Sequence, residues 1–547
     1  MILDKNGKPI RARPEPSKLL ASGYSNGAAN LESANLKGWD WSGGSPDDDI
    51  VSVLPIIRQR SRDLTMNAPI VAGLIETITT NVVGPGLIPE PTVDAEFLGM
   101  DEDESAKWKA NVMRHWEAFA EEDYCDVERR NNFYEITQLV SRAVNESGDV
   151  FIGLPMRRRA NSIIDTCIQV IEADCVSNPS FGDAMQQAEA NSDVFGGVEI
   201  GRDGNVIAFY ICTEHPLSQR TPMSTSGLWR KKQWVRVPAF GEETGRANIL
   251  HLMKSQRPGQ RRGVPILAPV VETSKMLDRY VKSELQASLI QSLFTVIITS
   301  ANPEGEAGEE SNYSDASFLE DQIALGAGIV QYARPGEDVK PVSPSRPYTS
   351  FDPFITAQLK MIGASTGVPL EMLTMTFDSS FSASRAAMNM ATAGFKVRRA
   401  WLVKRFCQPV YKSFLDECVA RGFVNAPGYF ENPLKRMAYQ KARWHGPGYL
   451  QIDLLKEIQA AKARVELGVS TLATETSELT GGDWRQNAIE RGLEERFAEL
   501  HGWKPALGGD SNSKDTIWQD EDGNEGNDKP KVLVTGKEQD GRRKRGW

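Results

Sequence analysis

The chain has 547 residues, of which 40% are hydrophobic and 25% charged, as in an ordinary soluble globular protein. It is too long for one compact core, so we expect two or three structural units. The net charge of −10 argues against a protein that coats nucleic acid, because such binding neutralises phosphates with clustered cations. Any contact with nucleic acid must therefore be local or weak.

Residues 1–48 are rich in Gly, Ser, Asn and Pro and predict a flexible N-terminal arm. The start of this arm has no apolar run and does not resemble a secretory signal. Amphipathic patterns then predict helices over 47–64, 69–81, 105–121 and 133–147. The third helix has four apolar side chains on one face, which we expect to be buried: Trp108, Val112, Trp116 and Phe119.

From residue 149 to residue 251 the period changes to that of short strands. We expect strands at 150–154 and 166–171, and a hairpin of 198–200 with 206–211 around an Asp-Gly turn. Together with the preceding helices this predicts an α+β unit over 49–262. Six cysteines are scattered without a Cys-x-x-Cys pair, which indicates reduced thiols in a cytosolic protein.

We expect the middle of the chain to run outward along one helix and back along a second one. A helix over 263–293, opened by Gly-Val-Pro, would be roughly 40 Å long. Residues 294–346 predict a small β module with an acidic insertion, and a second helix lies within 347–367. The weakly charged stretch 285–303 contains several Gln and Ser residues, so we expect no membrane span there.

A loop over 368–382 is predicted next, followed by a long helix within 383–425. Pro409 lies inside this helix, so we expect a kink near 405–409. Residues 426–504 predict a further helical region, with helices over 453–467 and 484–501. The tail, 505–547, is acidic and then basic, which is typical of disorder.

The sequence contains no pattern of catalytic or ligand-binding residues. The five histidines lie far apart without the spacing of metal ligands, so we expect them to be structural. The phosphate-binding loop, the dinucleotide fingerprint and the Gly-x-Ser-x-Gly elbow are absent, and no carboxylates form a distinctive pair. We therefore expect no enzyme, no catalytic residue, no metal site and no cofactor.

Two features of the region 351–405 each allow two interpretations. The long helix carries five cations within ten residues and no acid between them: Lys396, Arg398, Arg399, Lys404 and Arg405. They form either a solvated or ion-paired helix face, or a surface that meets a polyanion. The preceding loop is either a simple surface connection or a functional loop. The sequence alone does not decide between these interpretations.

Several short segments, in this order, resemble the lambda-type family of tailed-bacteriophage portal proteins. They are Leu54 to Leu64 (LPIIRQRSRDL), Asn81 to Gly84 (NVVG), Arg262 to Val270 (RGVPILAPV), Gly367 to Pro369 (GVP), Ser382 to Ala386 (SASRA), Gln408 to Tyr411 (QPVY) and Val469 to Leu472 (VSTL). The resemblance covers about residues 40–500. The long C-terminal tail departs from the family pattern, so no function is carried onto it.

The resemblance implies a mainly helical α+β fold of the portal type. In that fold 49–262 is the wing, 263–293 and 347–367 are the two stem helices, and 294–346 is the clip. Residues 368–382 are then the tunnel loop, 383–425 the tunnel helix, and 426–504 a helical region of the wing and crown side.

The resemblance also implies a function: a ring, usually a dodecamer, at a unique capsid vertex, through which double-stranded DNA is packaged and later ejected. Implied partners are the terminase large subunit, a head–tail connector protein, and the major capsid and scaffold proteins, with no membrane. The protein is expected in the virion, and in the host cytoplasm during assembly. Expected channel residues are Met372, Thr374, Met375, Phe377, Ser379, Ser380, Phe381, Lys396, Arg398, Arg399, Lys404 and Arg405.

An acidic ring with few local cations suits a conduit, because every tightly neutralised phosphate adds binding free energy that resists sliding. We expect 374–381 to form the mobile narrowest point. Two other classes of function are weighed against this one. A packaging nuclease or ATPase is disfavoured by the missing nucleotide loop and acid cluster, and a tail or scaffold component would lack a DNA channel.

Overall fold

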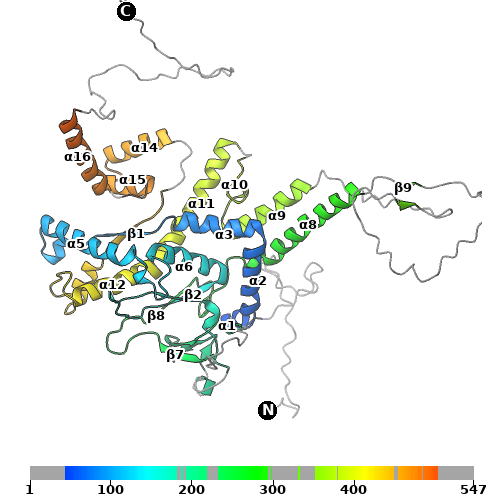
Figure 1. Cartoon of the computed structure of the whole chain (residues 1–547), viewed down its shortest axis with the longest axis horizontal. Coiled ribbons are helices and arrows are strands. Elements are labelled where there is room, and N and C mark those ends of the chain that lie inside the picture. The colour runs from blue at the N-terminus through cyan, green and yellow to red at the C-terminus, as the bar shows by residue number, and fades with distance from the viewer. Residues whose placement is uncertain are drawn as a thin grey trace, which may run out of the picture. The chain divides into compact units, whose positions relative to one another are not determined.

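The computed structural model describes residues 43–180, 185–186, 188, 193–218, 232–293, 297–298, 331–332, 351–377, 380–448, 454–482 and 484–502. The chain divides into two units, Met1–Gly482 and Asp483–Trp547. The described residues are mainly helical with several small sheets (Figure 1), which confirms the expected fold class at that level. Within these residues no helix is both long and apolar enough to cross a membrane.

The N-terminal helices are α1 (Pro46–Val51), α2 (Leu54–Asn67), α3 (Pro69–Val82), α4 (Ala95–Leu98), α5 (Glu102–Ala120) and α6 (Phe133–Ser147). The single helix predicted over 47–64 is wrong, because the chain breaks between α1 and α2. Pro55 lies in the first turn of α2, the place where a missing N–H costs no helical hydrogen bond. The prediction for α6 is confirmed, with a capping box at Asn132.

Two antiparallel sheets follow. The first has the order β3-β2-β8, with β2 at Asp149–Gly153, β3 at Gln169–Ile171 and β8 at Ile249–Met253. The second has the order β4-β5-β6-β7, with β4 at Val194–Phe195, β5 at Val198–Ile200, β6 at Val206–Cys212 and β7 at Trp234–Pro238. The predicted hairpin of β5 and β6 is confirmed, and Gly204 has the positive φ of 76° that its turn requires.

The main core joins the beginning and the end of the first unit. The indole of Trp116 is fully buried, with ring centroids 4.9 Å from Phe133 and 5.2 Å from Phe414. It also packs against Tyr411 and Trp444. The apolar face predicted for α5 is therefore confirmed as buried, and its partners come from α6 and from residues nearly three hundred positions further on.

A buried carboxylate lies between α2 and the first sheet. Asp149 is completely buried and contacts Arg58 Nη2 at 2.5 Å, Arg262 Nε at 2.7 Å and His251 Nε2 at 3.3 Å. Its Oδ2 atom also accepts the backbone N–H of Gly263 at 3.0 Å. Burial alone raises the pKa of Asp149, but Arg262 and Arg58 outweigh it and hold that pKa well below the usual range.

The helix predicted from residue 263 begins later, as α8 (Val271–Leu293), after a 3-10 turn at Ala268–Val270. The preceding segment packs against the end of α6, where a Cβ on Gly263 would lie only 2.1 Å from the carbonyl oxygen of Gly148. Ile266 N–H donates to Asn145 O there, so this segment bonds to α6 and not to a helix of its own.

Helix α9 (Phe351–Thr366) lies beside α8, as Figure 1 shows. The ring of Tyr280 on α8 packs against Phe351 and Phe354 on α9, with centroids 5.7 and 4.9 Å apart. Of the β module predicted over 294–346, only a two-stranded parallel pair is described, β9 (Ile297–Ile298) with β10 (Gln331–Tyr332). The remainder of that module lies outside the described residues.

The long helix predicted from residue 383 consists of α11 (Phe381–Leu402), a π-helical turn (Val403–Cys407) and α12 (Gln408–Ala420). Proline in a helix interior removes one hydrogen-bond donor and crowds the preceding turn. The turn before Pro409 is widened, and Gln408 N–H donates to Val403 O, five residues back. A local disturbance thus lies where a kink was predicted.

The region 426–504, predicted as a helical region, also contains a strand. Besides α13 (Pro433–Tyr439), α14 (Leu454–Glu466) and α15 (Leu472–Leu479), it contains strand β11 (Ala442–His445), which pairs antiparallel with β1 (Ile88–Pro91). Helix α16 (Trp484–His501) belongs to the second unit. Most of the predicted arm and the whole predicted tail lie outside the described residues.

We predict that Asp149→Asn destabilises the protein by about 3–5 kcal/mol, because it leaves Arg58 and Arg262 buried without their counter-charge. Urea unfolding followed by tryptophan fluorescence measures this change. Asp203→Asn is the matched control, because Asp203 is exposed in a hairpin turn that accepts Asn-Gly equally well. Equal stability of the two variants would contradict the structural role of Asp149.

The same interaction predicts a pH dependence. Because the pKa of Asp149 is lower in the folded chain than in the unfolded one, its stabilisation is present above the unfolded pKa of about 4 and disappears as the pH falls below it. We expect the unfolding midpoint of the wild type to fall more steeply below about pH 4 than that of Asp149→Asn. Parallel curves for the two proteins would contradict this expectation.

Candidate nucleic-acid interface

The segment between α9 and α11 begins with a tight turn and a short helix. Gly367 has φ 73° after the end of α9, and α10 (Leu370–Thr374) follows Pro369. Its side chains Met372 and Leu373 point into the core, each 8% exposed. The loop predicted over 368–382 is therefore wrong in its first half, and Met372 is a core residue. After α10, the described residues 375–377 and 380 lie outside any helix.

The described part of this loop exposes two large apolar side chains. Met375 is 74% exposed at a φ of 55°, and Phe377 is 59% exposed. The hydroxyl of Thr374 donates to Leu370 O at 2.9 Å and so belongs to α10. Ser380 is exposed before the first turn of α11, which begins at Phe381. Ser379 lies outside the described residues.

Two cations of α11 are used within the subunit. Lys396 Nζ lies 3.0 Å from Glu478 Oε1 of α15. Arg399 donates from Nε to Val82 O and from Nη2 to Asn81 O, both at 2.9 Å, and to Pro447 O at 3.1 Å. Carbonyls at the end of a helix have no partner within that helix, so Arg399 caps α3 and fastens α11 to it.

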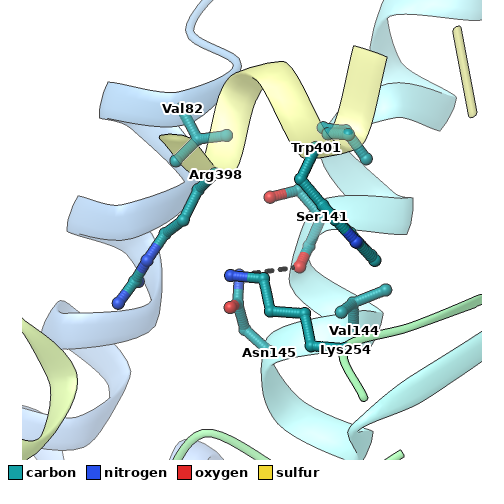
Figure 2. A pocket seen from close by; sticks show the side chains of 8 residues that line it. Val82, Ser141, Val144, Asn145, Lys254, Arg398 and Trp401 are labelled. Atoms are coloured by element: carbon teal, nitrogen blue, oxygen red, sulfur yellow. Dashed lines mark hydrogen bonds between the residues drawn. The ribbon is translucent and has the colours of Figure 1, made fainter. Parts of the chain in front are cut away.

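Arg398 also points into the protein. One terminal nitrogen, Nη2, donates to Thr366 O at the end of α9. The other, Nη1, is buried and makes no hydrogen bond within the described chain. Burial lowers the pKa of Arg398. Arg398 thus lines a small cavity with Lys254, a residue that no sequence pattern singled out (Figure 2).

Lys404 and Arg405 differ from the other three, because both are exposed on the π-helical turn. The five cations, which lie within ten residues of the sequence, therefore have separate roles in the structure. Arg398 and Arg399 hold helices together, Lys396 pairs with an acid, and Lys404 and Arg405 present charge at the surface.

The described residues contain one group of possible metal ligands, Glu172, Asp174 and His215, which no sequence spacing indicated. Two arginines already occupy it: Arg62 pairs with both carboxylates and Arg58 lies 3.3 Å from Asp174. Burial raises the pKa of Asp174, but the pairing with Arg62 and Arg58 outweighs this and lowers it. With its negative charge already balanced, this group does not fit a metal site.

Comparison with known proteins gives a consistent result. The family model described as "Phage portal protein, lambda family" matches residues 32–399. Portal protein B of Escherichia phage lambda is 25% identical, over 88% of this chain and 91% of that protein. The portal protein of Escherichia phage N15 is also 25% identical, over 88% of this chain and 92% of that protein.

A solved structure entitled "Neck of native GTA particle computed with C12 symmetry" is 12% identical and covers 77% of this chain and 94% of that one. Its TM-score of 0.38 is too low to add to the argument. The family model, by contrast, spans more than half of the sequence and includes α8, α9, α10 and most of α11. The chain is therefore a phage portal protein and belongs to the lambda family of portal proteins.

Proposed function

We propose that copies of this chain close into a ring, usually of twelve, at one vertex of the capsid, and that double-stranded DNA passes through the ring during packaging and ejection. Membership of the portal family is the observation that carries this proposal. The protein acts as a structural conduit of the virion and assembles in the host cytoplasm. It is not an enzyme.

The pair of helices α8 and α9 supports assembly with further copies. Apolar side chains at 41–61% exposure follow both helices: Met276, Val281, Leu285, Leu289, Phe354 and Met361. Exposed apolar side chains of this number on a pair of packed helices usually mark an interaction surface. We propose that these helices are the stem and that neighbouring copies cover these side chains in the ring.

The exposed residues of the loop and the π-helical turn are the best candidates to face DNA. They are Met375, Phe377, Ser380, Lys404 and Arg405. The first three can touch DNA without binding phosphate tightly, and the two cations contribute only a local charge. Since phosphate neutralisation determines how strongly DNA is held, this sparse set suits a channel in which DNA slides.

The proposed partners follow the division of the chain. The clip, 294–346, is proposed to dock the terminase large subunit and later the head–tail connector protein. The outer surface of the wing, 49–262, is proposed to meet the major capsid and scaffold proteins. The tunnel loop and tunnel helix are proposed to line the channel, and residues 426–504 to form the helical region of the wing and crown side.

Negative-stain images of the full-length protein test the ring, alone and after co-expression with the phage capsid and scaffold proteins. We expect rings with a central hole. The double variant Leu285→Glu and Leu289→Glu should lower the fraction of rings at least tenfold, because it places charge in the proposed interface. Leu217→Glu is the control, since Leu217 is 65% exposed away from α8 and α9. Filaments, or no rings under either condition, would exclude a portal ring.

The roles of the cations predict different effects of their removal. Lys404→Gln with Arg405→Gln should weaken binding of double-stranded DNA to the assembled ring, and should lower the slope of log K against log salt by about 1 for each phosphate that is no longer neutralised. Arg399→Gln should instead lower the thermal midpoint, because it removes the cap of α3. An unchanged salt slope in the double variant would remove Lys404 and Arg405 from the DNA-facing set.

Deletion of residues 376–379 tests the loop as the narrowest point of the channel. This deletion spares Thr374, which belongs to α10, and Phe381, which begins α11. We expect the filled capsids to leak DNA, measured as nuclease-sensitive DNA after packaging. Replacement of the same residues by Gly and Ser is the control for chain length. Unchanged packaging and DNA retention in the deletion variant would contradict this role.

A further inference from the structure

A small cavity lies where the proposed tunnel helix meets the body of the subunit. It has a volume of about 20 Å³ and is lined by side chains from α3, α6, the segment after β8, and α11. These are Val82, Ser141, Val144, Asn145, Lys254, Arg398, Trp401 and Leu402 (Figure 2). A space of this size holds one particle about as large as a water molecule.

The two charged side chains of the lining are both positive. Arg398 brings a guanidinium whose Nη1 atom is buried without a hydrogen-bond partner among the described residues. Lys254 brings an ammonium that lies 5.6 Å from the centre of the Trp401 ring. Burial, and secondarily the charge of Arg398, lower the pKa of Lys254 to about 8, so the ammonium form still predominates at pH 7.

The described surroundings supply no counter-charge. The cavity lining contains no carboxylate, and no described acid raises the pKa of either Lys254 or Arg398. The carboxamide of Asn145 carries no charge, and its Nδ2 atom donates to Ser141 O at 2.8 Å (Figure 2). Lys254 itself is exposed, so the uncompensated cost falls on Arg398, whose buried N–H has no acceptor among the described residues and whose charge is repelled by Lys254.

We propose that this cavity binds one monovalent anion of the size of chloride, held between Arg398 and Lys254. A water molecule in this cavity would accept a hydrogen bond from Arg398, but it would leave the repulsion between the two cations in place. An anion accepts from the guanidinium and also cancels that repulsion, since charge-assisted hydrogen bonds are the stronger kind.

Bound there, the anion joins helix α11 to α6 and to the segment after β8. It adds to the hydrogen bonds that Arg398 makes with the end of α9 and that Arg399 makes with the end of α3. This site goes beyond the DNA channel and does not depend on ring formation.

The test compares thermal unfolding of the full-length protein in sodium chloride and in sodium gluconate at equal ionic strength, because gluconate is a much bulkier anion than chloride. We expect chloride to raise the midpoint of the wild type by about 2 °C or more, as a ligand of the folded state does. Lys254→Met should abolish this difference. In gluconate it should also be at least as stable as the wild type, because it removes one of two repelling charges.

Lys412→Met is the matched control, since it removes an exposed lysine of α12 and should keep the full chloride effect. A crystal soaked in bromide should show an anomalous peak between Arg398 and Lys254. The proposal is overturned by equal midpoints of the wild type in the two salts, by a full chloride effect in Lys254→Met, or by no bromide at the site. A carboxylate from a neighbouring copy in the cavity would overturn it as well.

Discussion

One buried carboxylate determines how the first unit is put together. Asp149 begins β2, two residues after the end of α6, and is shared by Arg58 of α2, by Arg262 and by His251 of β8. An unpaired charge in this position is prohibitively costly, so these segments are stable only when all of them are in place. Because Asp149 also accepts the N–H of Gly263, it fixes the point from which the chain leaves toward α8. An interaction within the proposed wing thus fixes the position from which the chain enters the proposed stem.

Packing within the subunit also explains why some cations of the long helix do not present their charge at its surface. Arg398 and Arg399 lie among five cations that look alike in sequence, yet both bond to backbone carbonyls at the ends of other helices. Their charge stabilises the arrangement of α3, α9 and α11. The surface of the helix is correspondingly less basic than its sequence suggests. For a proposed conduit this matters, because weak attraction lets DNA move in both directions.

The sequence predicted what depends on local pattern and missed what depends on distant partners. Helix α6, the buried face of α5 and the β5–β6 hairpin follow from periodicity, caps and an Asp-Gly turn. Strand β11 was missed because four residues pair with a strand far away in sequence, and Met372 was misplaced because α10 has only five residues. The inward direction of Arg398 likewise follows from tertiary packing, which no local pattern encodes. The family, by contrast, was recognised from short motifs spread along the chain, and the family model confirms it.

The pairing of β1 with β11 has a consequence for how the subunit is made. Residues 88–91 find their partner only in residues 442–445, and Trp116 finds part of its packing in Trp444. The ribosome must therefore synthesise most of the chain before the core can close. Long-range pairing of this kind also slows folding. A chain cut short before β11 retains an open strand edge and an incomplete core. The pairing of β1 with β11 thus couples closure of the core to the synthesis of nearly all of the first unit.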